Sequence, residues 1–301
     1  MGLGTPGSPL PGDGAYVVKS RFAIPLGVPD VATAIGDLRA FSQHGGQVLL
    51  DRSTGTAARQ ALDALPTSLK TNLASWIDLE LDKLKIGTVT VRQAAAQVAT
   101  IADSVTTEFT LESSLTISPT GATHALRDLN FTPASLDVVI PIGGLAADKI
   151  TQHTTATVGE AGALELGDQK FALGFGNHAW HAINLATTRL YGGDTTILSS
   201  INCDAVAQKV AARCVSGTCV GHTAELLAVC QQGMTSLVDR LREELAPIEL
   251  DTFRLVRGSA TLVDKVGIDG IADIITNGTW QTETDAGMGV RTTQVTFTAL
   301  D

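Results

Sequence analysis

Apolar residues recur at two different intervals along this chain, and the interval changes near residue 105. Over residues 56–85 and 91–105, leucine, isoleucine and valine recur every three or four positions, which is the period of a helix with one apolar face. Beyond residue 105 the interval falls to two, because Phe109, Leu111 and Leu115 alternate with polar residues. Alternation of this kind is typical of an antiparallel strand with one face in water. The pattern therefore predicts two long helical segments followed by a long strand.

The same periodicities predict the other elements of the chain. Strands are expected at 15–24, 123–131, 136–142, 151–175 (two or three of them), 250–263, 279–285 and 290–299, and helices at 30–41 and 177–191. Few of these strands are separated by helices that would cross over a sheet, which favours antiparallel pairing. The predicted fold class is α+β, with a long curved antiparallel sheet packed on amphipathic helices in a single domain over residues 15–301.

The four cysteines have a symmetric spacing, Cys203-x10-Cys214-x4-Cys219-x10-Cys230. Residues 201–213 and 221–245 are good helix formers, and eleven residues make about three helical turns. An antiparallel helical hairpin therefore sets the two inner cysteines opposite each other, and likewise the two outer ones. The spacing predicts two nested disulfides in a helical hairpin inserted at 197–246. A zinc site and free thiols are the alternatives, although zinc sites usually carry two tight cysteine pairs and this chain has one.

This arrangement resembles the doubly stapled helical hairpin of α-hairpinin peptides, over residues 201–245. The resemblance concerns the scaffold and implies no activity. Disulfides of this kind are typical of an oxidising compartment. The sequence therefore predicts an exported protein, in the periplasm or associated with the outer membrane.

Residues 1–14 are rich in glycine, proline and serine and cannot form a core, so we expect a flexible tether. Such tethers commonly follow the lipid-modified cysteine of bacterial lipoproteins, which suggests an exported chain from which a signal and a lipid anchor were removed. A plain disordered terminus is the alternative. The formal net charge is −10 and no basic cluster occurs, which disfavours nucleic acid and direct binding to anionic lipid surfaces.

Two further resemblances bear on function. The order of elements and the strand length over residues 15–175 resemble those of tubular lipid-binding domains, in which a curved sheet wraps a long amphipathic helix. The segments GSATLVD at 258–264, NGTW at 277–280 and TFT at 296–298 resemble uncharacterised exported lipoproteins of myxobacteria. The second resemblance implies a location more than a chemistry.

These patterns lead us to expect a carrier of a hydrophobic ligand, a lipid or a sterol, in an apolar cavity between the sheet and the helices. Each buried methylene of such a ligand contributes about 0.8 kcal/mol, so no charged contact and no cofactor are required. The residues expected to line the cavity are Leu69, Leu73, Trp76, Ile77, Phe109, Leu111, Leu115, Val138, Ile140, Phe171 and Phe175. The same residues also suit an ordinary dry core.

Two other classes of function stay open. A non-catalytic structural or adhesion module of the envelope needs only the tether and the disulfides. A metal-dependent hydrolase would use His178 and His181, which lie three positions apart on a predicted helix. Its third ligand would be His222, Glu225 or His153.

Enzyme chemistry is otherwise weakly indicated. The chain has no G-x-S-x-G elbow, and the cysteines are expected in disulfides, so we expect no enzyme. The run Asp264-x4-Asp269-Gly270-x2-Asp273 is similar to calcium loops. However, Val266 and Ile268 stand where such a loop needs oxygen ligands.

Overall fold

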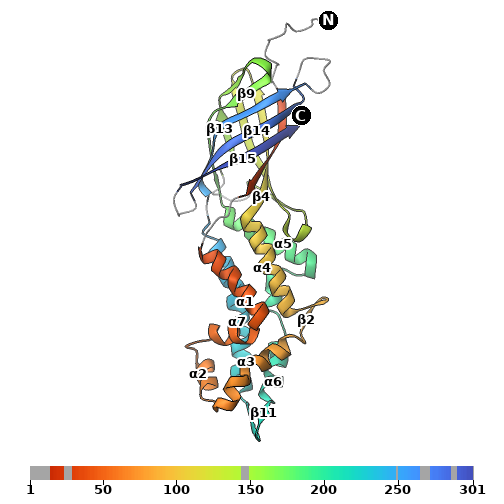
Figure 1. Ribbon diagram of the computed structural model, residues 1–301, viewed down its shortest axis with the longest axis vertical. Coiled ribbons are helices and arrows are strands. Elements are labelled where there is room, and N and C mark those ends of the chain that lie inside the picture. The colour runs from red at the N-terminus through yellow and green to blue at the C-terminus, as the bar shows by residue number, and fades with distance from the viewer. Residues whose placement is uncertain are drawn as a thin grey trace. The chain divides into compact units, whose positions relative to one another are not determined.

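The computed structural model describes residues 14–23, 29–143, 149–248, 250–264, 272–285 and 290–300. The chain divides into two compact units. The first comprises Met1–Val28, Ser104–Ala182 and Pro247–Asp301 and holds the large sheet, so we call it the sheet unit. The second comprises Pro29–Asp103 and Ile183–Ala246 and is mainly helical, so we call it the helical unit. The α+β class is confirmed (Figure 1). The expectation of a single domain over residues 15–301 stays a prediction.

An antiparallel sheet dominates the sheet unit. Its strands are β1 (Gly14–Ala23), β4 (Glu108–Ser118), β5 (Gly121–Phe131), β6 (Val138–Pro141), β7 (Thr151–Thr154), β8 (Ala156–Val158), β9 (Ala163–Leu166), β10 (Gln169–Leu173), β13 (Leu250–Val263), β14 (Ile274–Asp285) and β15 (Val290–Leu300). They pair in the order β6-β5-β4-β1-β15-β14-β13-β9-β8. Strands from both ends of the chain therefore share one sheet, because β1 lies between β4 and β15.

The sheet curls until its two sides meet. On one side β5 pairs with β7, and on the other β13 pairs with β10. Lys149, just before β7, and Ala172 of β10 form an antiparallel bridge with two backbone hydrogen bonds of 2.9 and 3.3 Å. Strand pairing therefore leads from β13 through β14, β15, β1, β4, β5, β7 and β10 back to β13. A small closed sheet has an interior that its own side chains can fill or that can hold one small ligand.

Large aromatic side chains fill this interior. Tyr16, Phe22, Phe171, Trp280 and Phe297 are each at most 2% exposed. The indole of Trp280 stacks on the ring of Phe297 with 4.8 Å between centroids. Two glycines make room for these rings. A Cβ atom on Gly258 would lie 2.1 Å from the indole, and one on Gly278 would lie 2.5 Å from the Phe297 ring.

The helical unit contains α1 (Pro29–Arg52), α2 (Ala57–Asp63), α3 (Thr67–Leu81), α6 (Cys203–Ala211), α7 (Thr223–Leu245), the 3-10 turn η3 (Thr195–Leu198) and the short pairs β2 (Lys85–Ile86) with β3 (Val89–Thr90) and β11 (Cys214–Val215) with β12 (Thr218–Cys219). The helices α4 (Val91–Thr107) and α5 (Phe175–Tyr191) each belong partly to this unit. The 3-10 turns η1 (Pro133–Ser135) and η2 (Glu160–Gly162) belong to the sheet unit.

Glycines let α1 pack closely against its neighbours. The helix is kinked at His44, whose φ and ψ of −139° and 57° are not helical. A Cβ on Gly46 would lie 2.1 Å from the carbonyl oxygen of Ala74 on α3, so only glycine fits there. The backbone N–H of Gly46 also donates to Asp78 of α3 at 2.9 Å. The predicted helix at 30–41 therefore continues to residue 52 across a glycine pair that resembles a stop signal.

The long strand begins later than predicted. Residues 105–107 still belong to α4, and β4 starts at Glu108. Polar Thr106 and Thr107 look like the start of the alternation, but α4 continues through them. The remaining predicted strands correspond to β1, β5, β6, β13 and β15, with small differences at their ends. The stretch 151–175 holds four short strands, β7–β10, instead of the expected two or three, and β14 begins at Ile274, five residues before the predicted strand at 279–285.

Both predicted disulfides are confirmed, Cys203–Cys230 and Cys214–Cys219. The geometry around the inner pair is different from the prediction. Cys214 and Cys219 do not face each other from two helices. They form a cross-strand pair of the β11–β12 hairpin, and α7 begins only at Thr223. The reason is local, because Ser216 and Gly217 adopt φ of 49° and 82°, as a tight type I′ hairpin turn requires.

Candidate ligand-binding pocket

The residues expected to line a lipid cavity are distributed over both units. Leu69, Leu73, Trp76 and Ile77 lie on α3 in the helical unit, and Phe109, Leu111, Leu115, Val138, Ile140, Phe171 and Phe175 lie in the sheet unit. All are buried except Trp76, which is half-buried. Within the sheet unit they are packed against one another, as the rings of Phe109 and Phe175 show with 5.1 Å between centroids. Ile77 borders a void of only about 10 Å³. The expected cavity between sheet and helices stays a prediction.

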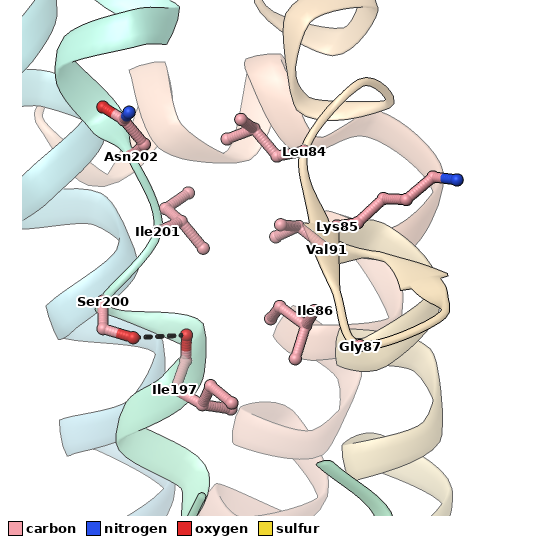
Figure 2. A pocket seen from close by; sticks show the side chains of 9 residues that line it. All are labelled: Leu84, Lys85, Ile86, Gly87, Val91, Ile197, Ser200, Ile201 and Asn202. Atoms are coloured by element: carbon pink, nitrogen blue, oxygen red, sulfur yellow. Dashed lines mark hydrogen bonds between the residues drawn. The ribbon is translucent and has the colours of Figure 1, made fainter. Parts of the chain in front are cut away.

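A larger pocket of about 300 Å³ lies within the helical unit. Its lining residues come from two short segments, and they are Leu84, Lys85, Ile86, Gly87, Val91, Ile197, Ser200, Ile201 and Asn202. Figure 2 shows Ile86 and Val91 on one side of the pocket facing Ile197 and Ile201 on the other. The amine of Lys85 points away from the pocket in this view. We call this the isoleucine pocket.

The first wall is the turn between α3 and α4. Lys85 pairs with Thr90 and Ile86 with Val89, and Gly87 adopts a φ of 61° in the turn between them. The N–H of Val91 donates to the carbonyl of Leu84 at 3.1 Å and closes the base of this small hairpin. Two residue pairs are enough to fix the hairpin because both of its ends continue into helices. It presents Ile86, which is 6% exposed, to the pocket.

The second wall is the segment from η3 to the start of α6. Asp194 caps η3 by accepting from the N–H of Thr196 at 3.0 Å. Asn184 of α5 accepts from both the N–H and the hydroxyl of Thr195, at 3.2 and 2.8 Å. At the other end, Asn202 caps α6 by accepting from the N–H of Ala205 at 3.0 Å. The segment is therefore fixed at both ends.

The disulfide Cys203–Cys230 starts at the residue that follows Asn202. It ties the beginning of α6 to α7, and both of its cysteines are buried. On the second wall the Ser200 hydroxyl donates to the carbonyl of Ile197 at 3.0 Å. The lining residues combine five aliphatic side chains with the polar side chains of Lys85, Ser200 and Asn202, and include no carboxylate or imidazole. The aliphatic side chains suit contact with an apolar group.

The sequence pattern does not predict this pocket. It places Leu84 and Lys85 in a helix over 56–85, and residues 197–202 in the connection into the cysteine hairpin. One signal is nevertheless present in the sequence. Ile197 and Ile201 are large apolar residues in a stretch otherwise made mainly of threonine and serine, and Ile86 precedes a glycine turn.

A second constellation lies inside the sheet unit, around His124. Its Nε2 is 2.6 Å from the Ser113 hydroxyl, and its Nδ1 is 2.5 Å from Oε1 of Gln169. The amide oxygen can only accept, so Nδ1 carries the hydrogen and Nε2 accepts from Ser113. The ring stacks on Trp280, with 5.9 Å between centroids and 12° between planes, and meets Phe171 edge-on. A nucleophile, a base and an orienting group would have this connectivity.

The environment of His124 excludes nucleophilic chemistry in the folded structure. Ser113 and His124 are both 0% exposed, so no substrate reaches the hydroxyl. Burial lowers the pKa of His124 to about 4, while its hydrogen bond to Gln169 acts in the opposite direction. Nε2 of Gln169 and Nε1 of Trp280 are buried and have no hydrogen-bond partner among the described residues. The cluster is a polar part of a packed core.

The sequence carries a signal for this cluster as well. Ser113, His124 and Gln169 occupy inward positions in the alternation of β4, β5 and β10, where the neighbouring inward residues are apolar. Three polar residues at inward positions of different strands predict a buried hydrogen-bonded group.

The histidines proposed for a metal site lie in different environments. On α5, His178 is 5% exposed and His181 is exposed. Of the suggested third ligands, His153 bonds to the Thr123 hydroxyl at 2.9 Å, and His222 lies 3.6 Å from Glu225. Across the described residues, no three histidine, cysteine or acidic side chains are grouped as a metal ion requires. The calcium-like run includes Asp269 and Gly270, which lie outside the described residues, as does most of the tether at 1–14.

Comparison with protein-family models, with curated proteins and with solved structures finds no match to this chain. None of the helices in the described part of the chain has both the length and the apolar character that crossing a membrane requires. The two disulfides are consistent with an oxidising, exported environment.

Proposed function

We propose that this chain is a non-catalytic binding protein that holds one small apolar ligand, or one acyl chain of a lipid, in the isoleucine pocket. The observation that carries the proposal is the pocket itself. About 300 Å³ is bounded by five aliphatic side chains from two rigid walls, Leu84, Ile86, Val91, Ile197 and Ile201. Polar lining residues such as Ser200 and Asn202 are exposed and have their hydrogen bonds within the protein.

The size of the pocket favours a slender ligand. Pockets for small molecules have volumes of about 300–1,000 Å³, so this one is at the lower limit. A single hydrocarbon chain suits it better than the rigid ring system of a sterol. A polar head group would stay in water at the rim, where Lys85, Ser200 and Asn202 are exposed.

The expected affinity is modest. Eight methylenes buried at about 0.8 kcal/mol each contribute about 6 kcal/mol, which corresponds to a dissociation constant of tens of micromolar. No buried charge or directional hydrogen bond adds to this value. Binding of this strength fits a carrier that takes up and releases its ligand.

The proposed location is the periplasm or the outer membrane of a bacterium, where an N-terminal lipid anchor would tether the protein. Its support is the pair of disulfides together with the glycine- and proline-rich composition of residues 1–14. A carrier in that place would hold lipid or another apolar molecule outside the cytoplasm.

Mass spectrometry of an organic extract of the purified protein identifies a bound ligand, and titration with dodecanol measures the affinity for a plain chain. The variant Ile201→Phe places a ring in the pocket and should weaken dodecanol binding about tenfold or more. The matched control is Leu79→Phe on α3, because Leu79 is 50% exposed and does not line the pocket. It should bind dodecanol like the unmodified protein.

Two outcomes would overturn the proposal. One is an extract without apolar ligand combined with no saturable binding of dodecanol, which would favour a structural or adhesion module. The other is equal binding by the Ile201→Phe variant and the unmodified protein, which would move the binding site away from the isoleucine pocket.

A further inference from the structure

The two disulfides differ in their access to solvent. Cys203 and Cys230 are 3% and 2% exposed. Cys214 and Cys219 are exposed, as are Gly217 and Thr218 between them. Exchange requires a thiolate to reach a sulfur atom, so a reagent in solution has direct access to the second bond alone.

The backbone around the exposed disulfide is held independently of the sulfur atoms. Cys214 and Cys219 are directly opposite in the β11–β12 hairpin. Beyond them, the N–H of Val220 donates to the carbonyl of Arg213 at 2.9 Å. The N–H of Gly221 donates to the carbonyl of Ala211, also at 2.9 Å. The hairpin is therefore paired on both sides of the cysteines.

Side chains anchor the base of this hairpin to the helical unit. The guanidinium of Arg213 lies 2.8 Å from the carboxylate of Glu80 on α3, whose side chain is 6% exposed. Burial alone would raise the pKa of Glu80, but hydrogen bonds from Lys83 and Arg213 outweigh it and lower that pKa, so the ion pair persists at neutral pH. Val220 is 2% exposed and adds an apolar anchor. Breaking the exposed disulfide leaves all of these contacts in place.

We propose that Cys214–Cys219 is a reversible exchange site that accepts electrons from a dithiol, either a protein or a small molecule, while Cys203–Cys230 stays oxidised. A thiolate of the dithiol attacks one sulfur, the S–S bond breaks, and the other cysteine leaves as a thiolate that takes up a proton. The second thiol of the reductant, after losing its proton, then attacks the reductant's sulfur in the mixed disulfide, that S–S bond breaks, and the protein cysteine leaves as a thiolate that takes up a proton. The products are two protein thiols and the oxidised dithiol.

The reduced state is prepared for reoxidation. The hairpin keeps Cys214 and Cys219 opposite each other, so the bond re-forms without a search through other conformations. The Cys214–Cys219 disulfide closes a short loop, is exposed to solvent and lies in a paired hairpin. It can therefore be reduced and re-formed without unfolding of the helices.

The test is reduction of the intact chain by dithiothreitol at neutral pH, with aliquots alkylated over time and both cysteine pairs quantified by mass spectrometry. Cys214 and Cys219 should become alkylated at least about tenfold faster than Cys203 and Cys230. The far-UV circular dichroism should not change during that phase. Removal of the reductant and addition of glutathione disulfide should restore the bond.

The variant Gly217→Ala tests whether the hairpin turn holds Cys214 and Cys219 in position for reoxidation. Its added Cβ meets no atom within 4 Å, but the φ of 82° is unfavourable for alanine, so the turn weakens without a clash. Reoxidation of Cys214–Cys219 should slow several-fold, and the reduction rate of Cys203–Cys230 should not change. Parallel reduction of both pairs, or no reduction of Cys214–Cys219 in the folded protein, would overturn the proposal. An unchanged reoxidation rate in the variant would also contradict it.

Discussion

The interiors of the sheet unit and the helical unit are stabilised in different ways. The sheet unit closes on itself and fills its interior with aromatic rings and a hydrogen-bonded polar cluster around His124. The helical unit has smaller side chains at its crossings, where Gly46 and Gly233 allow close approach, and two disulfides. The helical unit also contains the isoleucine pocket of about 300 Å³.

This difference separates stability from binding. In the sheet unit, large rings such as those of Trp280 and Phe297 are packed against one another, and we expect these residues to contribute mainly to stability. In the helical unit, the two disulfides contribute part of the stability. Its short connections form the walls of the isoleucine pocket and the exposed β11–β12 hairpin. Residues that affect folding most should therefore lie in the sheet unit, and residues that affect binding should lie in the helical unit.

The largest expected effect compares a tryptophan in each unit. Trp280→Ala removes a fully buried indole and should lower the free energy of unfolding by about 3–5 kcal/mol. Trp76→Ala, at a half-buried site on α3, should lower it by about 1 kcal/mol. Urea unfolding of both variants measures the two values. Equal losses would show that the sheet interior is not the better packed one.

The next effect compares the two disulfides. Removing a bond that closes a longer loop costs more, since the unfolded chain regains more conformations. The cysteines of Cys203–Cys230 are 27 residues apart and those of Cys214–Cys219 are 5 apart. Replacing both cysteines by alanine should cost about 3.5 kcal/mol in the first case and about 2 kcal/mol in the second. A larger loss for the Cys214–Cys219 pair in thermal or urea unfolding would contradict this assignment of roles.

Acid should weaken the sheet unit through His124. Its pKa is about 4 in the folded protein and near 6.5 when exposed, so the unfolded chain binds the proton more readily. The stability from neutral His124 is complete above pH 6.5 and falls as the pH drops from 6.5 to 4, by about 3 kcal/mol in total. Urea unfolding at pH 7 and at pH 4.5 measures the loss. His153→Asn, at an exposed histidine, should lose as much stability as the unmodified protein between these pH values, whereas His124→Asn should lose less.

Much of the fold could be predicted from periodicity and spacing. In both β4 and α3 one face is buried, and the period of the apolar residues in the sequence shows which face that is. The disulfide pairing was also predictable, because the spacing puts Cys203 level with Cys230 in any hairpin, helical or not. The hairpin itself was mispredicted where two residues of positive φ, Ser216 and Gly217, replace a helical connection.

The binding site was not predictable by the same reasoning. The expected lining residues are apolar and periodic, and those properties are shared by every core residue. The isoleucine pocket instead depends on a glycine turn at Gly87 and on caps at Asp194 and Asn202. These local features fix where a loop runs, but the space between two loops depends on long-range packing that no single segment encodes.

The most direct test of the proposed binding function is methyl NMR of isoleucine Cδ1 groups during titration with dodecanol. The account predicts saturable shifts for Ile86, Ile197 and Ile201, which line the pocket, and none for Ile117, Ile140 and Ile275, which are buried in the sheet unit. Shifts confined to the sheet-unit methyls, or no saturable shift at all, would contradict it.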